Sequence, residues 1–154
     1  MLYFYAMRQH NGMRPQDIVI LLKLVGLREQ AWQYRDLAAH LSMPLSEISV
    51  SLKRSEMAGL YNPNTRNVHR QALMEFMQYG LRYVFPVTPG GMVTGVPTAH
   101  THPFYVNDFV AEMVYVWPDL EGESRGLSIE PLHINVPKAA RKDEQLYKLL
   151  ASVD

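Results

Sequence analysis

The segment from Tyr34 to Leu60 constrains the fold more than any other part of this chain. Leu37, Ala38 and Leu41 have helical spacing and form one apolar face. Pro44 then interrupts the pattern, because proline lacks a backbone N–H and disfavours the helical conformation in the residue before it. Apolar residues at helical spacing resume beyond the proline. The segment therefore predicts two short helices joined by a tight turn.

The second of these helices, predicted over residues 46–58, combines an apolar inner face with a small, polar and basic outer face. Ser46 is its expected N-cap, and Ile48 and Leu52 are expected to point inward. The residues expected to point outward are Ser46, Glu47, Ser49, Val50, Lys53 and Arg54. The major groove of DNA accepts a short helix with such a face, so the segment predicts a helix-turn-helix.

The flanking sequence extends this motif on both sides. Residues 15–27 are predicted to form a first helix, and residues 31–33 a short strand. Residues 62–66 are rich in turn-forming types, so residues 61–68 are predicted to form a small hairpin, or wing. The order helix, strand, helix, turn, helix, wing resembles the winged helix-turn-helix domains of MarR-like bacterial transcriptional regulators over residues 15–80.

MarR-like regulators place the second motif helix in the major groove and the wing on the DNA backbone, and the resemblance implies the same roles here. Ser49, Val50 and Lys53 are expected to face base edges, beside Ser46, Glu47 and Arg54, with Arg35 and Arg66 on phosphates. Many members of the family carry a glycine in the turn, where Ser42 or Met43 stands in this chain. A single helix and a thin wing offer few contacts, so a homodimer on two half-sites is expected.

The charges of the chain are unevenly divided, although the net charge is zero. Residues 1–80 hold nine Lys and Arg against six Asp and Glu, and residues 81–154 hold six against nine. The half that carries the motif is therefore the basic one, as binding to phosphates requires. The chain has no cysteine and no apolar run long enough to cross a bilayer, which predicts a cytoplasmic protein without disulfides or a membrane span.

The second half differs in composition, with most of the prolines and glycines of the chain. Its predicted elements are a strand at 81–87, a long loop, a short helix at 107–113, strands at 114–117 and 125–130 around a solvated acidic hairpin tip, and a helix from about Pro137 with Leu146, Leu149, Leu150 and Val153 on one face. The expected fold class is α+β, with a winged helix-turn-helix domain over residues 1–80 and a loop-rich extension over residues 81–154. The helix after the wing is expected to run straight into the extension, so that both halves share one core.

The segment His100-Thr101-His102-Pro103 is the one pattern that points toward an enzyme. It resembles the start of the metal-binding motif of JAMM-type zinc isopeptidases, and Asp108 or His133 would supply a third ligand. Ala111 and Val114 stand where that motif requires Ser and Asp. We therefore expect an incidental pair of loop histidines, with no metal, no other cofactor and no enzymatic activity.

Two hypotheses for the function follow from the sequence. The first is a sequence-specific transcriptional regulator that binds double-stranded DNA as a homodimer, its chains paired through residues 1–7 and the last helix. The alternative is a protein-interaction module, such as an antitoxin or accessory protein, that binds a partner through its acidic C-terminal half. A shared fold does not decide between them, so both stay open at this point.

Overall fold

The computed structural model describes residues 8, 10–106 and 113–154, and its fold class is α+β, as predicted. The helices are α1 Pro15–Leu27, α2 Tyr34–Leu41, α3 Leu45–Met57, α4 Arg70–Tyr79, α5 Leu81–Val84, α6 Val136–Lys142 and α7 Glu144–Ala151. The strands are β1 Tyr61–Asn62, β2 Asn67–Val68, β3 Met92–Pro97, β4 Tyr115–Pro118 and β5 Ser124–Ser128, with a 3₁₀ turn, η1, at Ala99–Thr101. Residues 1–7 and all but the last residue of the helix predicted at 107–113 lie outside the described residues.

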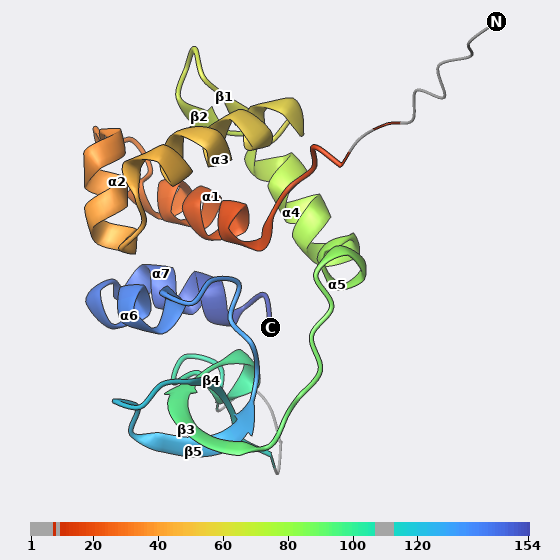
Figure 1. The fold of residues 1–154 in the computed structure, drawn as a ribbon, viewed down its shortest axis with the longest axis vertical. Helices are drawn as coiled ribbons and strands as arrows, with labels where there is room; N and C mark the ends of the chain where they lie inside the picture. Colours follow the sequence, from red (N-terminus) through yellow and green to blue (C-terminus); the bar gives the residue numbers. More distant parts are fainter. Residues whose placement is uncertain (1–7, 9, 107–112) are drawn as a thin grey trace, which may run out of the picture.

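The elements form three layers (Figure 1). Helices α1 to α3 and the β1–β2 hairpin make the upper layer, α6 and α7 the middle one, and strands β3 to β5 the lower one. Helix α4 runs down the side of the upper layer to α5, and an extended segment leads from there to the barrel. The hairpin and the barrel therefore lie at opposite ends of the molecule.

Helix α1 is the centre of this arrangement, and its bounds are those predicted from the sequence. Residues 18–22 are almost completely buried, because α3 packs on one side of α1 and α7 packs on the other. The hydrophobic core accordingly draws on both halves of the chain, with Leu37 and Leu52 in the same cluster as Trp117 and Leu150. The expectation of one shared core is confirmed.

The turn between α2 and α3 depends on a left-handed residue at Ser42 (φ 55°, ψ 43°). The N–H of Met43 donates to the carbonyl of Ala38 (3.0 Å). This hydrogen bond caps the C-terminus of α2 in the way that is usual for helices ending in a left-handed glycine. The side chain of Asn135, just before α6, donates to the carbonyl of Ser42 (2.6 Å). The C-terminal half thus helps to fix the turn of the predicted motif.

The prediction that Ser46 caps α3 was wrong. The helix begins at Leu45, and Pro44 is its N-cap residue. The ring holds φ of Pro44 at −59°, close to the helical value, and its carbonyl accepts the N–H groups of Glu47 (3.0 Å) and Ile48 (3.3 Å). Ser46 instead lies in the first turn of α3, where its side chain is exposed.

Two predicted strands are absent from the described residues. Residues 31–33 form no strand, and β1 pairs with β2 alone in a two-stranded hairpin. Residues 81–84 form the short helix α5, and Phe85 beyond it packs edge-on against Phe76 of α4 (6.3 Å between ring centres). Pro86 has no N–H to donate to a sheet, and both edges of β3 are already paired, so residues 81–87 find no partner strand.

Strands β3, β4 and β5 close into a small barrel. Strand β3 pairs antiparallel with both β4 and β5, while β4 and β5 pair parallel to each other. The backbones approach so closely that a Cβ atom at Gly95 would overlap the carbonyl oxygen of Trp117. The two strands predicted on either side of the acidic turn are confirmed, but they are not the arms of a hairpin. The acidic turn is also not simply solvated, because Asp119 and Glu121 both form ion pairs with Arg141 of α6.

The closing helix predicted from about Pro137 is in fact two helices, separated at Asp143. The side chain of Asp143 caps α7 by accepting the N–H of Leu146 (3.0 Å) and forms an ion pair with Lys23 of α1 (2.5 Å). Burial alone would raise the pKa of Asp143, but the hydrogen bonds from Lys23 and Leu146 outweigh that effect and lower the pKa. Leu146 and Leu150 are buried within their own chain, in the shared core. These two leucines are therefore not available to pair two chains, and the other predicted dimer contact, at residues 1–7, lies outside the described residues.

Candidate nucleic-acid interface

The outer face of α3 stays open to solvent. Ser46, Val50 and Lys53 are exposed on it, with Glu47 and Ser49 partly exposed beside them. The opposite face carries residues 48, 51, 52 and 55, all buried against the core. Helices α6 and α7 and the barrel lie on the far side of α1 from α3, so within the described residues the C-terminal half does not cover this face (Figure 1).

Arg54, which the sequence placed on the same outer face, is turned inward. Its Nε and Nη2 atoms donate to the two carboxylate oxygens of Asp17 (2.8 and 2.7 Å), and Asp17 is completely buried. Asp17 also accepts the backbone N–H of Arg14 (2.8 Å). The hydrogen bond with Asp17 raises the pKa of Arg54, against the opposing effect of burial. Arg54 therefore anchors α3 to α1 and presents no free guanidinium to a ligand.

Arg35 lies in the first turn of α2 with an exposed side chain. The cap of this helix is made by its neighbours, since Asp36 accepts the backbone N–H of Gln33 (2.9 Å). Arg35 and the positive end of the helix dipole lie in the same first turn, which also holds the carboxylate of Asp36. A phosphate group placed there would be attracted by both, as the sequence-based role of Arg35 requires.

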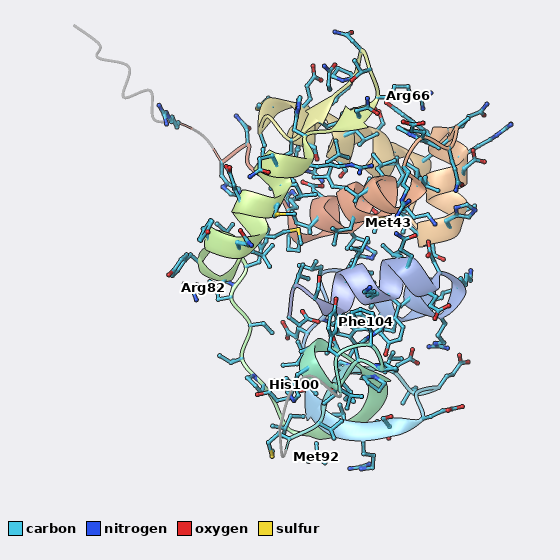
Figure 2. The ribbon with its side chains drawn as sticks, turned by 180° about the vertical axis from the view of Figure 1, so that it is seen from behind. Met43, Arg66, Arg82, Met92, His100 and Phe104 are labelled. Carbon is cyan, nitrogen blue, oxygen red and sulfur yellow. The ribbon has the colours of Figure 1, made fainter. Side chains whose placement is uncertain are left out.

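Arg66, at the end of the hairpin turn, is exposed but not free of contacts within its own chain. Its guanidinium carbon lies 4.0 Å from the centre of the Trp32 ring, and its Nη2 atom donates to the Trp32 carbonyl (2.9 Å). Figure 2 shows Arg66 beside the wing, at the opposite end of the molecule from Met92. The contact ties the wing to residues 31–33, where the sequence had predicted a backbone strand pairing. The turn itself is fixed by Asn62, whose Oδ1 accepts the N–H of Asn64 (2.9 Å).

The predicted site residues thus fall into three groups. Five of them, Ser46, Glu47, Ser49, Val50 and Lys53, come together on one face of α3. Arg35 lies at the start of α2 and Arg66 on the wing, whereas the partly buried Arg54 is paired with the buried Asp17. Sequence reasoning missed Trp32 and Arg28, which line the surface beside Arg66. No local signal in the sequence connects Trp32 with Arg66, because the two residues are separated by half of the motif.

The two loop histidines make separate contacts. The Nε2 atom of His100 lies 2.7 Å from the carbonyl oxygen of Met113, and Nδ1 of His102 accepts the N–H of Phe104 (2.9 Å). Burial lowers the pKa of His102, which favours a neutral ring. Among the residues that the structure describes, no three His, Asp or Glu side chains gather in a group that would hold a metal ion. Asp108, one of the third ligands considered above, lies outside those residues.

Comparisons of the chain with protein families, with curated proteins and with solved structures find no match. Over the described part of the chain, no helix has the combination of length and apolar character that crossing a bilayer requires.

Proposed function

We propose that this chain is a winged helix-turn-helix protein that binds specific sequences in double-stranded DNA and regulates transcription. In this proposal α3 enters the major groove, and the wing at residues 61–68 lies on the backbone. The observation that carries it is the open outer face of α3, which the packing of the C-terminal half on the other side of α1 leaves free. The order of helix, helix, turn, helix and hairpin around that face supports the same function.

The chemistry of the open face suits contact with base edges. Ser49 and Lys53 offer hydrogen-bond donors for acceptors in the groove, and Val50, half exposed, offers an apolar contact for a thymine methyl group. Glu47 is also on this face. We assign it the role of repelling phosphates and so of weakening binding to random sequences. With Arg54 held by Asp17, Lys53 is the one basic residue of α3 that this proposal places on DNA.

The test compares two lysine-to-alanine substitutions, each of which removes one positive charge, on different surfaces of the protein. A duplex is selected from a random library by the wild-type protein, and affinities are then measured by fluorescence anisotropy. Lys53→Ala is expected to cost roughly 1–3 kcal/mol on the selected duplex and little on random DNA. Lys138→Ala, exposed on α6, should change neither affinity. A wild-type protein that binds no duplex even at low salt would contradict the proposal.

A homodimer stays part of the proposal, but we propose that its chains pair through α4 and α5 and not through the last helix. The last helix is occupied by α1 of the same chain, whereas Met74, Tyr79, Tyr83 and Val84 on α4 and α5 are all at least half exposed. A dimer paired through this α4–α5 face would leave both copies of α3 free for two half-sites about one helical turn apart. Light scattering in the presence and absence of the selected duplex measures this state, and a strictly monomeric mass in both would exclude it.

The same α4–α5 face favours the alternative function, a protein-interaction module. Tyr79 and Tyr83 are 71% and 72% exposed, and aromatic side chains of this kind often anchor protein interfaces. The acidic C-terminal half is a weaker candidate for the partner-binding surface than the sequence indicated. Three of its carboxylates already form ion pairs within the chain, namely Asp119, Glu121 and Asp143. Stoichiometric co-purification of a partner that Tyr83→Ala abolishes, without any binding of DNA, would favour this alternative.

A further inference from the structure

A small hollow lies between the end of α1, the base of the wing and the start of α4, and the proposed function uses only one of its residues, Arg66. Its volume is about 320 Å³, and the residues that line it include Arg28, Arg66, Arg70 and Trp32. Arg66 enters from the hairpin turn, Arg28 from the residue after α1 and Arg70 from the first residue of α4. Three separate elements thus bring an arginine residue to the lining of one hollow.

These three cations are not neutralised by the protein. Glu29 is the one carboxylate in the lining, and within the described residues none of the three arginines forms an ion pair with it or with any other carboxylate. Like charges gathered in one place repel one another, although the exposed position of these three residues lets water screen them. A bound anion would remove that repulsion. Arg66 donates one of its five N–H groups to the Trp32 carbonyl, so most of its N–H groups remain for such a ligand.

Two of the three arginines have an unusual backbone conformation. Arg28 and Arg66 both have positive φ angles, of 56° and 57°, in a region where a side chain is unfavourable and glycine is not. Local strain of this kind persists where the side chain is needed or where the surrounding structure enforces it. Among the described residues Ser42 and Ala99 also have a positive φ, but of these four residues only Arg28 and Arg66 line the hollow.

We propose that this hollow binds a phosphate group, held mainly by Arg28 and Arg70, while Arg66 is oriented by its contacts with Trp32. Guanidinium groups recognise phosphate through paired, charge-assisted hydrogen bonds, which favours this anion over chloride or a single carboxylate. The phosphate comes either from the DNA backbone beside the wing or from a free phosphorylated small molecule. The first source rests on the proposed function, and the second does not.

Inorganic phosphate is the probe for the site itself, titrated at constant ionic strength and followed by NMR of the two indole N–H signals. The signal of Trp32 is expected to shift in a saturable way, whereas that of Trp117, buried in the core, should stay fixed and report an intact fold. Arg28→Gln and Arg70→Gln should each lower the affinity for inorganic phosphate roughly tenfold or more, since each removes hydrogen bonds to a charged group. Arg82→Gln, on α5 and remote from the wing in Figure 2, is the matched control and should not weaken it.

The salt dependence of duplex binding distinguishes the two sources. If the phosphate belongs to DNA, Arg28→Gln and Arg70→Gln lower the affinity for all duplexes alike. Each also lowers, by about one, the slope of the logarithm of affinity against the logarithm of salt concentration. If it belongs to a small molecule, both variants lose inorganic phosphate and keep the wild-type slope. A Trp32 signal that does not respond, or responds equally in the variants, together with an unchanged slope, overturns the proposal. Duplex binding that still depends on Lys53 would then leave the proposed function standing.

Discussion

Replacing Arg54 should destabilise the fold, whereas replacing its neighbour Lys53 should not. The carboxylate of Asp17 is completely buried and depends on two hydrogen bonds from Arg54. In Arg54→Ala it keeps only the N–H of Arg14, and leaving a buried charge without its partner costs about 3–5 kcal/mol. For a chain of this length such a loss lowers the melting temperature by about 10 °C.

Lys53→Ala is the matched control, because it removes a positive charge one residue away on the same helix. Lys53 is exposed, and substitutions of this kind change stability by no more than about 0.5 kcal/mol. Thermal unfolding followed by circular dichroism measures both variants. In the double variant Asp17→Asn/Arg54→Met the buried charge is gone, so it should recover much of the stability that Arg54→Ala loses.

Equal, small effects of Arg54→Ala and Lys53→Ala on the melting temperature would refute this reasoning. Arg54 would then be free on the outer face of α3, where the sequence had placed it. If Arg54 is free in this way, Arg54→Ala should lower the affinity for DNA while the protein stays folded. The two residues thus separate an anchoring role from a recognition role on one helix.

Three further predictions concern the turn, the barrel and the contact between the two halves. Ser42→Gly should raise stability by about 1 kcal/mol in thermal unfolding, since glycine adopts the left-handed conformation without strain. Gly95→Ala should prevent the barrel from closing and lower the melting temperature sharply, whereas Gly91→Ala, which faces open space, should not. Because the folded-state pKa of Asp143 lies below the usual 3.8, its ion pair with Lys23 stabilises the fold above that pH and is lost as the pH falls through the folded pKa, so Asp143→Asn should flatten the acid limb of a pH–stability profile.

The elements that the sequence predicted well are those that local signals determine. Helix α1 was predicted with its observed bounds because Pro15 marks its start and its apolar residues recur at helical spacing. The turn before α3 followed from Pro44, and the hairpin turn from residues 62–66. Each of these signals lies within a few residues of the structure that it determines.

The failures share the opposite property. Arg54 looked like part of an exposed basic face, but its partner Asp17 lies on another helix and no local pattern announces the pair. The break at Asp143 likewise involves Lys23, which is distant in sequence. Residues 81–87 have strand-forming side chains, yet a strand needs a partner edge, and the sheet has none to offer. Long-range contacts of these kinds decide the direction of a side chain and the pairing of a strand.

The inward turn of Arg54 also changes what the proposed interface can do on its own. Without it, the basic residues left from those expected on DNA are Lys53, Arg35 and Arg66, one each from α3, α2 and the wing. At about 0.9 per neutralised phosphate, these three contacts alone give a salt slope no steeper than about −3 for one chain, and a DNA phosphate in the hollow beside Arg28 and Arg70 would add about one more. Nonspecific binding by a single chain would then be weak. Tight, specific binding would therefore require a second copy of the chain, which makes the state of the α4–α5 face as important to the proposed function as α3 itself.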